Sequence, residues 1–301
     1  MHAIKNEGRC DIVIADIGGT WLKLRAMRNG VALVEEAVHP ISKIKTTRPT
    51  ASLSDLIADF AKTCSLRDYF LVTTVPGFIG LDFDEVLHSS NMPELRGIHL
   101  RTELQSLLGQ PVIVERDAVL TLLGEYESGV ARGQDDVLGI FFGTGIGAAF
   151  LSGGKPFRGG GWALEIGHTP CGGAGHILED FGSGRALATL AKHRSVEVGG
   201  IFKSADTCPD LAAALDDFVS VQANAIATAV ALYSPKLLVL GGGVLEMDGY
   251  PREELIRKLL NRVSPRNIRD PEIRWSSLGW RSALFGAAHL LGQHGAFQIG
   301  G

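Results

Sequence analysis

The sequence has few cysteines and no apolar run long enough to cross a membrane. Four cysteines are scattered among 301 residues without the spacing of a disulfide framework, which is typical of a reducing cytoplasm. No apolar stretch reaches the ~18 residues of a membrane span. The first ten residues lack the apolar core of a signal peptide. We therefore expect a cytoplasmic protein that does not enter a membrane.

Excess charge is also missing, whereas glycine is plentiful. The net charge is −4, so no basic field attracts nucleic acid or an acidic membrane surface. The Walker A pattern is absent too. In contrast, with 301 residues, 45% of them hydrophobic, the chain is long enough for two lobes with cores of their own. The 38 glycines gather in a few segments, which we examine as candidate binding loops.

The first glycine turn follows an apolar segment that ends at Asp16. Gly18 and Gly19 come next, and an alternating segment begins directly after Thr20. Adjacent glycines accept the positive φ of a hairpin turn, so the pattern predicts strand, turn and strand. Bare N–H groups and the Thr20 hydroxyl suit a phosphate, and Asp16 suits a hydrated Mg²⁺. An ordinary hairpin with a capping Asp is the alternative.

Two later segments repeat this arrangement. Residues 137–142 are apolar and lead into a glycine turn at 143–147, and residues 236–240 lead into 241–243. The glycines of 143–147 also suggest a dinucleotide fingerprint, but that motif needs a helix after the turn, whereas a short strand over 148–151 follows. We interpret the second turn as another phosphate cradle. The third can lie flat against an adenine or ribose.

Polar side chains with chemical potential occur at two further places. Asp117 follows the strand predicted over 111–115, where open α/β sheets place their ligands, and directly precedes a predicted helix. It can be a general base or only a helix N-cap. The glycine-rich segment after Arg158 carries Glu165, His168 and Glu179, which suit bidentate hydrogen bonds to vicinal sugar hydroxyls. A solvated surface loop is the alternative.

The helical periodicity and the breakers complete the pattern. We predict helices over 52–62, capped by Ser52 or Ser54, and over 100–108, ended by Gly109. Residues 194–210 read as irregular. Further helices are expected over 118–128, 185–193, 211–232, 253–263 and 283–291.

Seven motifs in this order resemble the ROK family of sugar kinases and repressors. They are Asp16-Ile-Gly-Gly-Thr20, Asn91-Met-Pro, Arg116-Asp117, Gly143-Thr-Gly-Ile-Gly147, Glu165-Ile-Gly-His168, Leu178-Glu179 and Leu240-Gly-Gly-Gly243. Together they span essentially the whole chain. The resemblance implies the actin/Hsp70/hexokinase fold, two ribonuclease-H-like α/β lobes around a central cleft. We expect a small lobe over 1–115, joined by 283–301, and a large lobe over 116–282.

The resemblance also implies roles for individual residues. Asp117 would be the general base that takes the proton of the attacking sugar hydroxyl. The implied sugar-binding set is Gly77, Asn91, Arg116, Asp117, Glu165, His168 and Glu179. ATP phosphates and Mg²⁺, the latter through water on Asp16, would be held by Asp16, Gly18, Gly19, Thr20, Gly143, Thr144, Gly145 and Gly147. The nucleoside would lie at Gly241, Gly242 and Gly243.

One segment departs from the family pattern. Family members usually carry a Cys-x-Cys-Gly-x-x-Gly-Cys zinc loop, and here only Cys171-Gly-Gly-Ala-Gly-His176 is present. His168, Cys171 and His176 give three ligands, whereas a structural zinc site wants four. We therefore expect this loop to be free of zinc.

The function implied is ATP-dependent phosphorylation of a hexose, at O6, such as D-allose, glucose or fructose. Residues 239–255 and Arg116-Asp117 most resemble the D-allose kinases of the family. The alternative is a non-catalytic sugar sensor or regulator. Family regulators carry an N-terminal helix-turn-helix domain, and about ten residues precede the first strand here, so we expect no DNA-binding element. Dimers are common in the family, and we expect a homodimer.

Overall fold

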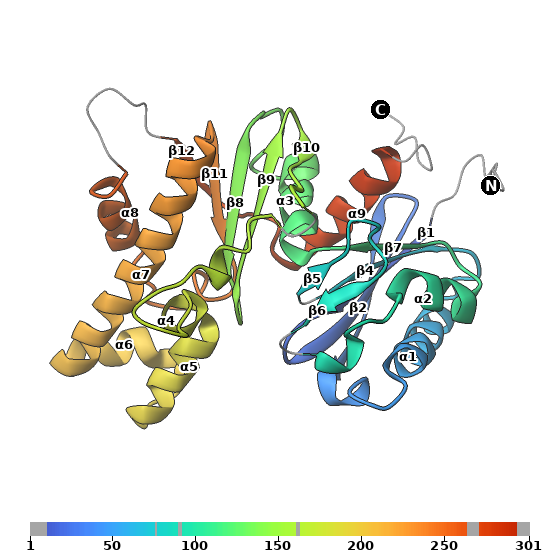
Figure 1. Cartoon of the computed structure of the whole chain (residues 1–301), viewed down its shortest axis with the longest axis horizontal. Coiled ribbons are helices and arrows are strands. Elements are labelled where there is room, and N and C mark those ends of the chain that lie inside the picture. The colour runs from blue at the N-terminus through green and yellow to red at the C-terminus, as the bar shows by residue number, and fades with distance from the viewer. Residues whose placement is uncertain (1–10, 76, 90–91, 161–162, 264–270, 294–301) are drawn as a thin grey trace. The chain divides into compact units, whose positions relative to one another are not determined.

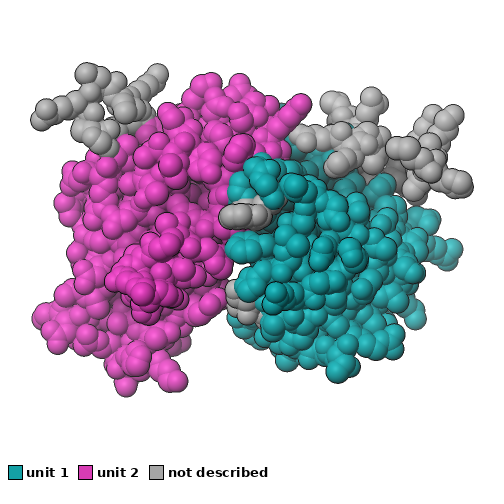
Figure 2. Space-filling model, viewed as in Figure 1, with its two compact units in different colours: residues 1–132, 158–163, 278–301 teal, residues 133–157, 164–277 magenta. Residues whose placement is uncertain are grey.

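The computed structural model describes residues 11–293 except for 76, 90–91, 161–162 and 264–270. Contacts divide the chain into two compact units, coloured separately in Figure 2. Unit 1 comprises Met1–Arg132, Arg158–Ala163 and Leu278–Gly301, and unit 2 comprises Gly133–Phe157 and Leu164–Ser277. The expected boundaries at 115 and 282 differ from this division.

Unit 1 is built on a five-stranded sheet. Its strands are β1 (Asp11–Ile17), β2 (Trp21–Arg28), β3 (Val31–Pro40), β4 (Phe70–Thr74) and β7 (Val112–Glu115). They lie in the order β3-β2-β1-β4-β7. The first three are antiparallel, as the hairpin pattern predicts, and β4 and β7 run parallel to β1. The C-terminal ends of β1, β4 and β7 therefore share one edge of the sheet.

Two helices, α1 (Pro49–Thr63) and α2 (Leu100–Leu108), contact each other in unit 1 (Figure 1). The predicted cap of α1 at Ser52 or Ser54 is wrong, because the helix begins three residues earlier at Pro49. Proline is favoured there, since its missing N–H has no helical partner in the first turn. The expected end of α2 is confirmed, with Gly109 in the left-handed region at φ +65°.

Helices α3 (Asp117–Ser128) and α9 (Ser282–Gln293) pack together in unit 1, although the whole of unit 2 lies between them in the sequence. Two glycines permit the close approach. A Cβ on Gly124 would lie 1.9 Å from the carbonyl oxygen of Ser282, and one on Gly286 would lie 2.0 Å from that of Leu120. This packing is why α3 belongs to unit 1, contrary to the boundary expected at 115.

Unit 2 repeats the same topology. Its strands are β8 (Val137–Phe142), β9 (Ile146–Ser152), β10 (Lys155–Pro156), β11 (Leu237–Gly241) and β12 (Glu272–Trp275). They lie in the order β10-β9-β8-β11-β12. Again β8, β9 and β10 are antiparallel, and β11 and β12 run parallel to β8. The duplicated strand-turn-strand pattern of the sequence is thus a duplicated sheet.

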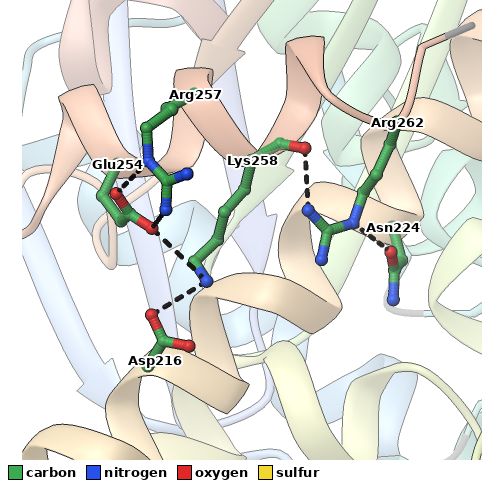
Figure 3. A network of polar contacts seen from close by, with 6 residues as sticks. All are labelled: Asp216, Asn224, Glu254, Arg257, Lys258 and Arg262. Carbon is green, nitrogen blue, oxygen red and sulfur yellow. Dashed lines mark hydrogen bonds and ion pairs between the residues drawn. The ribbon is translucent and has the colours of Figure 1, made fainter.

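The helices of unit 2 are α4 (Glu179–Gly182), α5 (Gly184–His193), α6 (Ile201–Ser204), α7 (Pro209–Tyr233) and α8 (Arg252–Leu260). The region predicted as irregular contains α6, whose Ile201 and Phe202 are buried. Charged side chains connect α7 to α8 (Figure 3). The Nζ of Lys258 lies 2.8 Å from Asp216 and 3.4 Å from Glu254. No helix among the described residues is both long and apolar enough to span a membrane.

Candidate functional site

Asp16 lies at the C-terminal end of β1 and is held by the neighbouring strand. The Oγ1 of Thr74, on β4, donates to Asp16 Oδ1 at 3.0 Å. The Oγ1 of Thr74 also accepts the N–H of Ile17, at 2.8 Å. Thr74 is 1% exposed, so this hydroxyl bridge is shielded from water, whereas Asp16 is only partly buried. The carboxylate is therefore fixed at the sheet edge and still reachable.

The turn after Asp16 needs glycine for a different reason from the one expected. Neither Gly18 nor Gly19 is among the glycines with positive φ, so the expected left-handed turn is wrong. Instead, the chain closes tightly: Gly18 N–H donates to Trp21 O at 2.9 Å, and a Cβ on Gly18 would lie 3.0 Å from that oxygen. Glycine here allows close approach of backbone to backbone.

Asp117 is the first residue of α3, directly beyond the end of β7. Its side chain is exposed, and its Oδ1 accepts the N–H of Ala118 at 2.6 Å. Arg116, not Asp117, occupies the N-cap position, and its side chain makes no cap hydrogen bond. Asp117 therefore satisfies a first-turn N–H, and its role as a general base stays a prediction.

Asp16 and Asp117 lie at the same edge of the sheet. β1 pairs with β4, Ala15 opposite Thr73, and β4 pairs with β7, Thr74 opposite Glu115. Because these strands are parallel, both carboxylates follow C-terminal strand ends of one sheet. That edge is where open α/β sheets bind ligands.

Two further predicted sugar-binding positions belong to unit 1. Gly77 has φ +150°, and a Cβ there would lie 2.1 Å from the carbonyl oxygen of His88, at the end of β6 (Val86–His88). This crowding accounts for glycine at the position. Asn91 lies outside the described residues. Its proposed contact to sugar stays a prediction.

The glycine turn after β8 joins a helix N-terminus in unit 2. Gly184 N–H, at the start of α5, donates to Gly143 O at 2.8 Å, and Arg185 N–H donates to Thr144 O at 3.2 Å. Ser183 caps α5 by accepting the N–H of Ala186 at 3.3 Å. The space where a Cβ of Gly143 would lie is open. These bonds occupy the N–H groups of Gly184, Arg185 and Ala186, so the features that would favour a phosphate here are the open face of Gly143 and the dipole of α5.

The three glycines after Leu240 have distinct structural reasons. A Cβ on Gly241 would lie 2.7 Å from the Cβ of Ser276, and a Cβ on Gly242, which has φ +98°, would lie 2.5 Å from the carbonyl oxygen of Phe142. At Gly243 the corresponding space is open. Since β11 pairs in parallel with β8, this open face lies beside the turn at 143–147. The nucleotide contacts expected at Gly143 and Gly243 stay a prediction.

Glu165, His168 and Glu179 belong to unit 2 and follow the turn at 143–147 in the sequence. Glu165 precedes the short helical turn Ile166–His168 and is partly buried, like His168. Glu179, the first residue of α4, accepts the N–H of Ile146 through Oε1 at 2.8 Å. A Cβ on Gly145 would lie 2.4 Å from the same oxygen. Glu179 therefore braces the glycine turn, and its contact to sugar stays a prediction.

The shortened loop between His168 and Glu179 is closed by its own backbone. Cys171 N–H donates to His176 O at 3.0 Å, and Leu178 N–H donates to Thr169 O at 2.9 Å. The ring of His176 lies 5.5 Å from that of Phe181. Among the described residues, the potential metal-binding groups with mutually close ligand atoms do not include His168, Cys171 and His176. These protein contacts define the conformation of the loop, and its expected lack of zinc stays a prediction.

One other cluster has the donor set of a metal site. Ligand atoms of Asp82, Asp84 and His99 lie within 4.8 Å of one another in unit 1. Asp84 already accepts hydrogen bonds from the N–H and hydroxyl of Thr102, at 2.9 and 2.6 Å, and lies 3.7 Å from Arg101. Burial alone would raise the pKa of Asp84, but these partners outweigh burial and hold it below its ordinary value. Asp84 is thus paired with protein groups, among them His99 and Arg101, whereas Asp82 and His99 are exposed.

Sequence reasoning missed several residues that position the predicted ones. Thr74, which holds Asp16, appears in the sequence only as part of an apolar strand. Glu115 and Arg158 pair at the end of β7, 2.7 Å apart. Glu115 is 2% exposed, and the sequence indicates this burial only through its place at the end of an apolar strand. The partner, 43 residues later, has no signal in local periodicity.

Comparison with known proteins agrees with the fold and with the family resemblance. The sequence model of the ROK family matches residues 13–294. A glucokinase of Halalkalibacterium halodurans is 26% identical, over 92% of this chain and 94% of that protein. An N-acetyl-D-glucosamine kinase of Erwinia tasmaniensis is 27% identical, over 91% and 97%. The crystal structure of a ROK family glucokinase from Streptomyces griseus, in complex with glucose and AMPPNP, superposes with a TM-score of 0.77 at 25% identity, over 95% of this chain and all of that one.

Proposed function

This chain belongs to the ROK family, and on that premise we propose that it is an ATP-dependent hexose kinase. The curated relatives matched over almost their whole length are named as kinases of glucose and of N-acetyl-D-glucosamine. The mixed α/β fold, with the same sheet in two units, is that of ROK sugar kinase structures. The substrate class we propose is a hexose with a free primary hydroxyl, such as glucose, D-allose or fructose.

The observation that carries the proposal is the exposed carboxylate of Asp117 at the sheet edge where Asp16 also lies. In the reaction we propose, Asp117 takes the proton from the attacking sugar hydroxyl. The hydroxyl oxygen then forms its bond to the γ-phosphorus, and the bond from that phosphorus to the bridging oxygen breaks, releasing ADP. Phosphoryl transfer depends mainly on positioning and charge stabilisation, which fixed carboxylates and backbone N–H groups supply.

The donor set also fits ATP and Mg²⁺. Asp16 is a partly exposed carboxylate with one oxygen anchored by Thr74, which suits a cation held through water. Bound there, Mg²⁺ would neutralise charge on the phosphates. The open glycine faces at Gly143 and Gly243 would hold phosphate and nucleoside. Glu165, His168 and Glu179, with Gly77, Asn91 and Arg116, are proposed for the sugar.

A non-catalytic sugar sensor is the second candidate. The structure of a ROK family transcriptional regulator, a homologue of E. coli MLC protein, superposes with a TM-score of 0.78 at 20% identity, which shows the shared fold alone. This chain covers 77% of that protein. The two functions differ in a single property, turnover, since both bind sugar.

The test is an ADP-release assay over aldohexoses, ketohexoses and N-acetylhexosamines, with Asp117→Asn in parallel. We expect turnover on one sugar, and a fall of about 10³-fold in kcat in the variant, typical of loss of a general base. Turnover that survives the substitution would remove Asp117 from the mechanism. Sugar binding by calorimetry, without turnover on any member, would establish the sensor instead. Size-exclusion chromatography with light scattering tests the homodimer that we also propose.

A further inference from the structure

A short stretch of unit 1 comes from the middle of the chain. The chain leaves unit 2 after Phe157, belongs to unit 1 over Arg158–Ala163, and returns to unit 2 at Leu164. Both ends of this stretch are held by the two residues that directly precede Asp117. The contacts among Glu115, Arg116, Arg158 and Ala163 all lie within unit 1, and we call them the Arg158 anchor.

At one end, Arg158 and Glu115 form a two-pronged ion pair. Nη1 lies 3.0 Å from Oε1, and Nη2 lies 2.7 Å from Oε2. The carboxylate is 2% exposed, whereas the side chain of Arg158 is 31% exposed. The parallel geometry matches the planar fork of guanidinium to carboxylate, which a lysine cannot reproduce.

The same carboxylate fixes the turn from β7 into α3. Glu115 Oε1 also accepts the N–H of Arg116 at 2.9 Å, one residue before Asp117. Arg116 is 6% exposed and donates through Nη1 to the carbonyl oxygen of Ala163, at the other end of the stretch. Two successive residues therefore bind the stretch from both sides, and the backbone that carries Asp117 runs between these contacts.

An aromatic ring completes the orientation of Arg158. Its guanidinium carbon lies 4.5 Å from the ring centroid of Phe83. A guanidinium stacked on a ring and bonded at both Nη atoms has little rotational freedom. The carboxylate of Glu115 is thereby fixed as well, because both of its oxygens contact Arg158.

We propose that Glu115 and Arg158 are positioning residues for Asp117. The ion pair fixes the strand-to-helix turn, and this turn sets where the Asp117 carboxylate stands at the sheet edge. The inference rests on the proposed role of Asp117 as general base. Neither residue needs to touch the sugar or the nucleotide, so their loss acts on catalytic rate more than on binding.

The first test compares Arg158→Lys with a matched control, Arg25→Lys. Arg25 is also buried, pairs with Glu36 at 2.5 Å and lies over Trp280 at 4.9 Å, within the same unit. For Arg158→Lys we expect kcat to fall by about 10-fold or more, with the KM values for sugar and ATP changed less than about 2-fold. For Arg25→Lys we expect kcat to stay unchanged. Glu115→Gln, which keeps the shape and the acceptor for Arg116 N–H, should lower kcat in the same direction.

A double-mutant cycle with Asp117→Glu distinguishes positioning from general structural support. When the base is already displaced, Arg158→Lys should cost less than about 2-fold further in kcat, because residues acting as a unit are not additive. The same fold-loss in both backgrounds would overturn the inference. A raised KM for sugar at unchanged kcat would also overturn it. Absence of turnover in the unaltered protein would overturn the proposed function and this inference together, whereas turnover insensitive to Arg158→Lys would overturn the inference alone.

Discussion

The two units share one sheet topology but differ in the chemistry that follows their strand ends. In unit 1, β1 ends at Asp16-Ile17 and β7 leads into Asp117, so carboxylates stand at the edge. In unit 2, β8 ends at Phe142, which is fully buried, and the turn that follows offers backbone groups beside the N-terminus of α5. At these strand ends, carboxylates stand in unit 1, whereas unit 2 has a glycine turn beside a helix N-terminus.

This difference has a physical basis. Carboxylates accept protons and attract hydrated cations, whereas N–H groups at a helix N-terminus attract anions. A reaction that moves a proton from a sugar and a phosphoryl group from a nucleotide needs both. The duplicated fold therefore supplies two scaffolds of the same geometry, and the residues after each strand decide what each scaffold can bind.

Removing charge from the unit 1 edge should have the largest effect. Asp16→Asn keeps the acceptor for the Thr74 hydroxyl but loses the charge that attracts Mg²⁺. We expect kcat to fall on the order of 100-fold and the Mg²⁺ concentration for half-maximal rate to rise. Steady-state rates over a Mg²⁺ titration measure both. An unchanged Mg²⁺ dependence would contradict the assignment of Asp16.

Replacing glycines at the unit 2 turn by alanine should lower the free energy of unfolding or raise the KM for ATP. A Cβ on Gly184 would lie 2.6 Å from the carbonyl oxygen of Gly143, so Gly184→Ala must push the helix off the turn. We expect a loss of about 1–3 kcal/mol in the free energy of unfolding. Gly143→Ala enters open space and should cost under about 0.5 kcal/mol while raising the KM for ATP. Urea unfolding with parallel kinetics checks the pair, and equal losses of stability would contradict it.

The hydroxyl bridge in unit 1 should have a smaller effect. Thr74→Val removes the donor to Asp16 and leaves the Ile17 N–H without that acceptor. We expect a loss of about 1–2 kcal/mol in unfolding free energy and a fall in kcat of less than about 10-fold. Thr73→Val, on the same strand, removes a hydroxyl that donates to Ala15 O at 3.1 Å and is the control. A kcat that falls equally in both variants would contradict a role for Thr74 in holding Asp16.

The smallest effect should come from the charge network between α7 and α8 of unit 2 (Figure 3). Hydrogen bonds from Arg257, with help from Lys258, lower the pKa of Glu254 from its ordinary 4.5 to about 2. Because the folded pKa is the lower one, the stabilisation is present above pH 4.5 and is lost as pH falls toward 2. Glu254→Gln should therefore reduce stability slightly at pH 7 and not at pH 2, measured by thermal unfolding. Glu253→Gln controls for loss of one carboxylate on the same helix.

The sequence predicted what depends on local pattern. The apolar run over 137–142 and the helical periodicity over 100–108 predict β8 and α2 with their observed bounds, and Gly109 ends α2 as expected. The helix expected over 185–193 is α5, which begins one residue earlier and is capped by Ser183. These features follow from neighbours within a few residues, which a single sequence contains. The edge positions of Asp16 and Asp117 followed from the same local logic.

What the sequence could not predict depends on distant partners. Gly18 and Gly145 are glycines because Trp21 O and the Glu179 carboxylate approach them, not because their φ is positive. The assignment of Arg158–Ala163 to unit 1 depends on Glu115, far earlier in the chain. The early end predicted for unit 1 failed because the packing of α3 on α9 joins segments that no local window contains.

The packing of α9 against α3 also has a consequence for synthesis. A ribosome completes unit 2 at Ser277 before it makes the last segment of unit 1, Leu278–Gly301. At about 5–20 residues per second, the helix that carries Asp117 waits on the order of ten seconds for its partner. During that time the surface of α3 around Gly124 and Leu120 lacks its packing partner, α9. A nascent chain therefore has an incomplete unit 1 while all residues of unit 2 have already been synthesised.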